Sequence, residues 1–224
     1  MRRTLERLSV LILLALVLPG CPNSYVTPAD TSAANLDVKL VVIDTPTSSD
    51  GKNVVVMQFL FGGKPVQFAG TETASCNGVG LTLNGLVFGY AERVPSVPVG
   101  GTYHFVYTHG GVPTAIDLVV PPRVVFTSPM AGATLARNNN MTIHYVADGG
   151  SGVDAGGSTS AVGLARNVFE PDNGTYTGLD TTSLGTGAGT LSLTRRFETT
   201  PTGTGFHAVS TQYDSISEIH VTWT

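Results

Sequence analysis

Short apolar runs separated by turn residues limit the fold of this chain more than any other feature of its sequence. Gly62-Gly63, Asn84-Gly85 and Gly110-Gly111 stand between such runs and supply the positive φ angles that tight hairpins require. This spacing is typical of a β-sandwich. We expect strands in the first part of the chain at residues 36–44, 53–61, 64–69, 79–83, 86–93, 102–108 and 113–120.

Alternation within these runs predicts which side chains face a core. In the run 102–108, Tyr103, Phe105 and Tyr107 alternate with smaller or more polar residues. Successive side chains of a strand point to opposite faces, so the three aromatic rings are predicted to lie in the core and His104 outside it. The run 53–61 is apolar on both faces and is predicted to be a central strand.

The sequence VVPPRVV divides the chain into two units. Pro121 and Pro122 cannot donate to a β-ladder and stiffen the join, which predicts a semi-rigid angle between the units. The opening of the second unit echoes the opening of the first, which indicates two copies of one kind of domain. We therefore expect one β-sandwich domain at 36–121 and a second at 122–224, each long enough for a two-sheet core.

The second unit shows the same kind of runs with a longer interruption. Residues 148–160 are rich in Gly and Ser and are predicted to form an interstrand loop. Arg195-Arg196 is interpreted as one outward-facing and one edge-facing arginine. Strands are expected near 141–147, 161–169, 174–177, 189–198, 204–213 and 216–224, the last with Ile219, Val221 and Trp223 facing a core.

Composition excludes two broad classes. Only 12% of the residues are charged while 42% are hydrophobic, which rules out a disordered chain. The net charge is -4, and the basic residues of the mature chain are scattered instead of forming a stripe that could neutralise phosphates. Nucleic acid is therefore not an expected partner.

The N-terminus is predicted to be an export signal that is removed from the mature protein. Arg2, Arg3 and Arg7 form a basic region, residues 8–18 form an apolar region, and Pro19-Gly20 interrupts it. The apolar region is too short to span the roughly 30 Å core of a bilayer as a lasting transmembrane helix. Arg2-Arg3 also fits the start of a twin-arginine signal, although the fuller motif is missing.

The signal ends in Leu18-Pro19-Gly20-Cys21, which resembles the lipobox of bacterial lipoproteins. The resemblance implies cleavage after residue 20, so that 1–20 is a lipoprotein signal peptide, and acylation of Cys21. Pro19 departs from the small or aliphatic residue usual at its position. Two or more acyl chains suffice for stable anchoring. The polar, Pro-containing segment that follows predicts a flexible tether, which together with Cys21 covers 21–35.

An ordinary secretory signal with a structural cysteine is the alternative interpretation. Cys21 would then pair with Cys76, the other cysteine of the chain. Pro22 argues against cleavage by an ordinary signal peptidase, and a cysteine on a flexible tether gains little from a bridge. Cys76 is accordingly predicted to be a buried, hydrophobic residue and not a reactive thiol, because no Lys, Arg or His lies nearby in the sequence.

The mature chain resembles tandem bacterial immunoglobulin-like domains of surface proteins, most closely in the stretch FTSPMAGATLARNNNMTIHY. It lacks the Cys, Trp and Cys hallmark of antibody-type domains, so the resemblance is to the general sandwich family. The implied fold class is all-β, with two immunoglobulin-like antiparallel β-sandwiches in tandem. Such a fold does not by itself imply a function.

A search for chemistry returns little. The catalytic motifs of hydrolases, zinc peptidases and phosphate-binding loops are missing, and the histidines show no ligand spacing. Residues 149–154 match only the start of one calcium-binding nonapeptide repeat, which binds calcium between stacked copies. We therefore expect no catalytic residue, no cofactor and no metal.

Two functions from different classes follow. The first is a non-enzymatic, lipid-anchored protein of the bacterial cell envelope, facing the periplasm or the exterior, that acts as a spacer, scaffold or binding module for an envelope protein or an extracellular ligand. The second is an envelope hydrolase or metal-dependent enzyme with a dispersed, loop-borne site. Its candidate residues are His144, Asp148, Asp154, Asp172 and Asp180.

Overall fold

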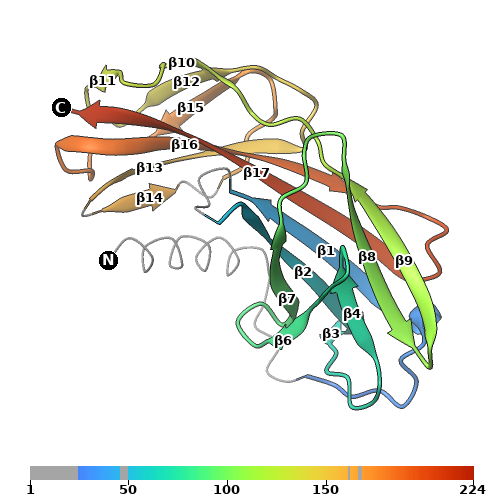
Figure 1. Ribbon diagram of the computed structural model, residues 1–224. Helices are drawn as coiled ribbons and strands as arrows, with labels where there is room; N and C mark the ends of the chain where they lie inside the picture. Colours follow the sequence, from blue (N-terminus) through green and yellow to red (C-terminus); the bar gives the residue numbers. More distant parts are fainter. Residues whose placement is uncertain (1–24, 46–49, 161, 166–167) are drawn as a thin grey trace.

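The computed structural model describes residues 25–45, 50–160, 162–165 and 168–224. The chain is all-β and forms two β-sandwiches that share one continuous sheet (Figure 1). That sheet contains ten strands. Eight follow the order β14-β13-β16-β17-β1-β2-β7-β6, and in addition β11 pairs with β17 and β3 pairs with β2. Each sandwich places a smaller sheet against a different part of this shared sheet.

The first sandwich packs the sheet β5-β4-β8-β9 against one half of the shared sheet. On the shared sheet it uses β1 (Asp37–Asp44), β2 (Lys52–Phe61), β3 (Lys64–Pro65), β6 (Thr82–Asn84) and β7 (Gly89–Pro95). The smaller sheet consists of β4 (Thr73–Cys76), β5 (Val79–Gly80), β8 (Thr102–His109) and β9 (Val112–Val119). A short 3-10 helix, η1 (Ala33–Asn35), precedes β1.

The second sandwich packs the sheet β10-β12-β15 against the other half of the shared sheet. Its smaller sheet consists of β10 (Phe126–Ser128), β12 (Met141–Tyr145) and β15 (Thr175–Leu179). On the shared sheet it uses β11 (Thr134–Leu135), β13 (Gly152–Thr159), β14 (Gly163–Ala165), β16 (Gly187–Thr199) and β17 (Ala208–Trp223). Among the described residues, no helix has the length and apolar character needed to cross a bilayer.

Strand β17 belongs to both sandwiches. Its first half pairs in parallel with β1, from Asp37 opposite Ala208 to Asp44 opposite Ser215, and its last residues pair with β11. Strand β16 runs antiparallel to it from Gly187 to Thr199. The red β17 accordingly runs from one sandwich into the other in Figure 1. The sequence predicts two separate runs here, 204–213 and 216–224, but the structure forms one strand across residues 214 and 215.

The first core confirms the alternation predicted for residues 102–108. Tyr103, Phe105 and Tyr107 are fully buried in it, whereas His104 is exposed. Three residues of the C-terminal part of the chain, Phe206, Val209 and Tyr213, also belong to this core. Strand β17 lies within the predicted second domain, 122–224. One of its faces nevertheless completes the core of the first sandwich.

The second core is built from both sheets of its own sandwich. Ile143, Tyr176, Leu191 and Trp223 lie in it with at most 1% of their surface exposed. The burial of Trp223 and Val221 confirms the inward face predicted for the last strand.

Two segments differ from the sequence-based expectation. Residues 25–35 belong to the predicted tether 21–35, yet Val26 forms a parallel bridge with Val66, and Val26 and Ala33 pack against the first core. The predicted loop 148–160 contains the buried strand β13. Its glycines suit this place because side chains from elsewhere press on them: a Cβ on Gly152 would lie 3.0 Å from Phe169, and one on Gly157 would lie 3.4 Å from Trp223.

Candidate functional site

The predicted lipidation residue Cys21, the signal peptide 1–20 and residues 22–24 lie outside the described residues. Lipidation of Cys21 therefore stays a prediction. The described chain begins at Tyr25, whose ring lies 6.0 Å from the ring of Phe88 in the turn between β6 and β7. The next residue is already fixed to the sandwich, since the Val26 backbone N–H donates to the Pro65 carbonyl at 2.9 Å.

Thr31 secures the same N-terminal segment further along. The buried Tyr107 hydroxyl donates to the Thr31 carbonyl at 2.5 Å, and the Thr31 hydroxyl donates to Glu72 at 2.6 Å. That second hydrogen bond holds the pKa of Glu72 below its ordinary value. Burial raises the pKa of Tyr107 to about 12. The segment from residue 25 to residue 35 is thus bound to the first sandwich through both its backbone and its side chains.

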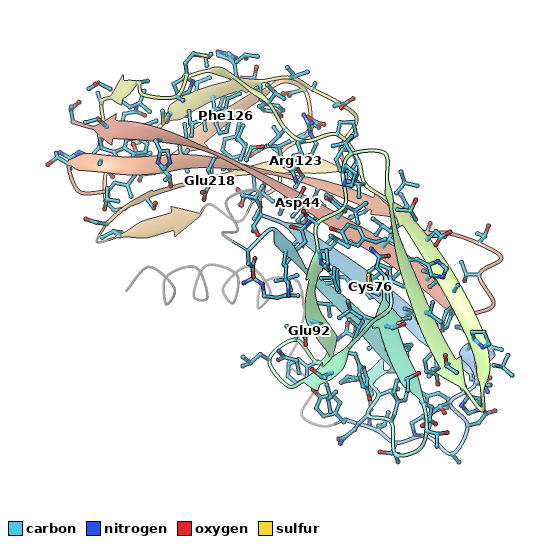
Figure 2. All side chains as sticks on the ribbon, viewed as in Figure 1. Asp44, Cys76, Glu92, Arg123, Phe126 and Glu218 are labelled. Carbon is cyan, nitrogen blue, oxygen red and sulfur yellow. The ribbon has the colours of Figure 1, made fainter. Side chains whose placement is uncertain are left out.

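A polar cluster fixes the connection between the two sandwiches. The Arg123 guanidinium donates to both carboxylate oxygens of the fully buried Asp44 at 2.9 Å, and the Tyr213 hydroxyl donates to the same carboxylate at 2.9 Å. Burial and the negative charge of Asp44 raise the pKa of Tyr213. Ser217 donates to the Val124 carbonyl at 2.6 Å. Figure 2 shows Asp44 and Arg123 where the two sandwiches meet.

The surface interpretation of Arg195-Arg196 is wrong. Arg195 is fully buried, with Nε 3.0 Å from the side chain of Asp172, and it also donates to the Val146 carbonyl. The guanidinium lies 5.8 Å from the centre of the Tyr145 ring. Arg195 lies on the face of β16 that points into the second sandwich. There the Asp172 carboxylate and the Tyr145 ring surround its guanidinium, where apolar side chains would otherwise be expected.

Arg196 faces the other side of the shared sheet and is partly buried. Its guanidinium donates to both oxygens of the fully buried Asp214 at 2.8 and 3.0 Å, and it lies 4.0 Å from the centre of the Phe169 ring. Gln212 donates to the same carboxylate at 2.8 Å. Two side chains therefore donate to the Asp214 carboxylate, so that a buried charge is tolerated within β17.

A pocket of about 300 Å³ opens beside this ion pair on the outer face of the shared sheet. Burial and the neighbouring Arg196 lower the pKa of the Lys39 ammonium group there. Hydroxyl, amide and charged groups of both signs line the pocket, so it suits a small polar ligand more than an apolar one. The lining residues are Lys39, Glu198, Thr199, Thr200, Ser210, Thr211 and Gln212.

Sequence analysis did not single out this pocket. Its signal is the alternation along β17, where Gln212 and Asp214 lie on the face opposite to the core residues Val209 and Tyr213. A pocket forms on this face because β1 and the end of β16 pair with β17. The pairing brings together residues that are distant in the sequence.

The five candidates for an enzymatic site are not gathered into one catalytic cluster. His144 lies opposite Thr175 at one end of β15, whereas Asp180 follows the other end and accepts from Thr182. Asp154 is buried and accepts from the Tyr176 hydroxyl at 3.1 Å.

Asp148 and Asp172 do lie close together, but through a structural contact. The Asp172 carboxylate accepts from the backbone N–H groups of Asp148 and Gly150 at 3.3 and 2.7 Å, in addition to its ion pair with Arg195. Both backbone groups donate to Oδ2, and Oδ1 accepts from Arg195 at 3.3 Å. The carboxylate therefore ties the loop that leads into β13 to the buried Arg195.

Two further histidines have carboxylate partners, and the described cysteine is buried. His104 lies 2.6 Å from Asp117 and His207 lies 2.6 Å from Asp37, in both cases at the surface. Across the part of the chain that the structure describes, no three His, Cys, Asp or Glu side chains are grouped so that they could hold a metal ion. Cys76 is a free, fully buried thiol, and burial raises its pKa to about 12, which confirms the prediction of a buried hydrophobic residue.

Comparison with known proteins identifies no family for this chain. No protein-family profile matches the chain. No curated protein matches it either.

Solved structures that it resembles include the fibronectin(III)-like modules of Clostridium thermocellum CbhA, with 13% identity, coverage of 87% of this chain and 90% of that one, and a TM-score of 0.28. A second is domains 4 and 5 of the S-layer protein SbsC, with 16% identity, 77% and 82% coverage and a TM-score of 0.22. A third is SGBP-B of the Bacteroides ovatus mixed-linkage glucan utilization locus, solved with a mixed-linkage heptasaccharide, with 14% identity, 92% and 68% coverage and a TM-score of 0.26. At these identities and TM-scores the likeness carries no conclusion about function. The chain itself is all-β and forms β-sandwiches, as the sequence predicts.

Proposed function

We propose that this protein is a non-enzymatic, lipid-anchored component of a bacterial cell envelope. Acyl chains on Cys21 hold it at a membrane, where its two sandwiches form a rigid scaffold or spacer facing the periplasm or the exterior. The scaffold presents its surface to another envelope protein or to an extracellular ligand.

The observation that carries the anchoring is the N-terminal sequence. A basic region, an apolar region of export-signal length and Leu18-Pro19-Gly20-Cys21 follow one another in the order that lipoprotein processing requires. Cys21 supplies the thiol that accepts the lipid, and Gly20 supplies the small residue before the cleaved bond. The buried, free state of Cys76 supports this assignment, because a disulfide is the competing role for Cys21.

The scaffold role rests on how the sandwiches are joined. Modules linked only by a peptide hinge move relative to one another, whereas a β-strand that continues through both cores transmits orientation. Here β17 continues through both, and the Asp44–Arg123 ion pair and the Ser217 hydrogen bond secure the remaining connection. A protein built in this way holds its two sandwiches at a fixed orientation to each other.

The test is analysis of the protein purified from its native host. We expect a mature N-terminus at Cys21 that carries the mass of acyl chains, and we expect the protein in the membrane fraction. A Cys21→Ser variant should remain unacylated and lose stable membrane association, while a matched Cys76→Ser variant should remain acylated and anchored. An unmodified Cys21, or a Cys21–Cys76 disulfide, would contradict the proposal.

A further inference from the structure

The first sandwich lies within a short reach of any lipid carried by Cys21. Only four peptide units separate Cys21 from Tyr25, and Val26 is already hydrogen-bonded to Pro65. A fully extended chain of that length spans at most about 14 Å. On the proposed function, which this inference depends on, the protein is therefore held against the membrane surface. The part of the sandwich around Tyr25 is the part that meets the membrane.

The residues around Tyr25 present apolar surface. The Tyr25 ring contacts Phe88, which lies in the turn that connects β6 to β7. Two leucines of the same hairpin are exposed: Leu86 with 64% of its surface and Leu83 with 37%. In Figure 1 the blue start of the described chain lies on the same side of the first sandwich as β6.

The turn is held in a shape that keeps Leu86 outside. The Leu86 backbone N–H donates to the Asn84 side chain at 3.0 Å, and Gln58 donates to the Phe88 carbonyl at 3.2 Å. The neighbouring Val87 points the other way and is buried in a cluster on the outer face of the shared sheet. Val87 thus takes the buried position of the turn and Leu86 the exposed one.

The hairpin can approach a lipid surface at little electrostatic cost. Residues 82–90 read TLNGLVFGY and contain no charged side chain. No ionised side chain of residues 82–90 has to be desolvated when this turn enters the headgroup region. Leucine gains from burial at the acyl boundary, and a tyrosine ring with its hydroxyl suits the interface between apolar and aqueous layers.

We propose that the β6–β7 turn, with Leu86 at its tip and Tyr25 beside it, inserts into the interface of the membrane to which Cys21 is anchored. The turn is a second contact that sets the orientation of the sandwich, in addition to the lipid that sets its location. The scaffold then projects from the membrane in one direction instead of pivoting about its lipid anchor.

The test uses the acylated full-length mature protein with a Leu86→Cys substitution, labelled with an environment-sensitive fluorophore. Acylated Cys21 has no free thiol, and Cys76 is buried with its pKa raised, so the label is confined to the introduced cysteine. The matched control is Met130→Cys in the β10–β11 loop of the second sandwich, because Met130 is 65% exposed and carries no charge. Both proteins are bound to vesicles of phosphatidylethanolamine and phosphatidylglycerol that contain a doxyl-labelled lipid quencher.

We expect both proteins to float with the vesicles, the label at residue 86 to shift to shorter wavelength, and the doxyl lipid to quench it several-fold more than the label at residue 130. Flotation with equal quenching at the two positions would overturn the membrane contact and leave the anchoring intact. Failure to float would overturn the anchoring itself, and this inference with it.

Discussion

Trp223 shows how strongly one packing contact depends on a residue without a side chain. Its indole ring is 1% exposed and donates from Nε1 to the Ser158 carbonyl at 3.1 Å. Gly189 lies against the same ring: an added Cβ there would lie 2.1 Å from the Ser158 oxygen and 2.6 Å from the indole nitrogen. The three strands β13, β16 and β17 approach this closely because Gly189 has no Cβ.

We therefore expect Gly189→Ala to lower the free energy of unfolding by about 1–3 kcal/mol, the usual cost of overpacking a core. The measurement is urea denaturation followed by Trp223 fluorescence. The matched control is Gly80→Ala, because a Cβ at Gly80 meets nothing within 4 Å; it should change stability by less than about 1 kcal/mol. Equal effects of the two substitutions would contradict the packing account.

The inward position of Trp223 could be predicted from the sequence, whereas the requirement for glycine beneath it could not. Alternation along one strand reports which face a side chain occupies. The requirement at Gly189 depends on Ser158, which a different strand brings into place. The burial of Arg195 cannot be predicted for the same reason, because nothing in its own strand indicates that the Asp172 carboxylate lies beside it.

Among the elements, β17 differs most from its prediction. Asp214 and Ser215 look like the polar break between two strands, and the sequence alone gives no reason to bury them. The structure buries both. Arg196 of β16 neutralises the Asp214 carboxylate, and Gln212 donates a hydrogen bond to it. Strand β13 differs in the opposite direction: glycines lower its strand propensity, yet they allow the close approach of Phe169 and Trp223.

The connection between the sandwiches yields a prediction about Arg123. Its loss would leave the buried Asp44 carboxylate with the Tyr213 hydroxyl as its remaining described side-chain donor. We expect Arg123→Ala to destabilise the protein by about 1–3 kcal/mol, the cost of removing a charged partner from a buried group. Urea denaturation at neutral pH measures the change.

Arg93 provides the matched control for that substitution. Its ion pair with Asp50 is 2.8 Å long, close to the 2.9 Å of Asp44–Arg123, but both of its side chains are more than 40% exposed. Exposed ion pairs contribute about 0–1 kcal/mol, so Arg93→Ala should have a small effect. If the two arginine variants lost the same stability, the Asp44–Arg123 pair would not be securing the connection.

At the scale of the whole molecule, the shared sheet makes the two cores depend on each other. The first core needs Phe206, Val209 and Tyr213, and β1 needs β17 as its parallel neighbour. The second core needs Val221 and Trp223 from the other end of that same strand. The weak internal repeat in the sequence predicts two copies of one kind of domain. It reports that the halves are similar and does not report the strand that they share.

We expect the two sandwiches to unfold in a single transition. Trp223 is the one tryptophan of the chain and reports on the second core, while Cys76 lies in the first core and, in a Cys21→Ser background, is the one remaining thiol. Urea titrations that follow Trp223 fluorescence and Cys76 labelling should give the same midpoint. Two well-separated midpoints would contradict the coupling.

Ile216 allows the cause of that coupling to be tested directly. It lies where β17 leaves its pairing with β1, whose last partner is Ser215, and continues along β16 opposite Thr194. Proline has no N–H and is not tolerated in the interior of a central strand. Ile216→Pro should therefore interrupt β17 between the two cores and separate the Trp223 and Cys76 midpoints. If coupling ran instead through the Pro121-Pro122 linker, the two midpoints would stay together in this variant and shift by the same amount.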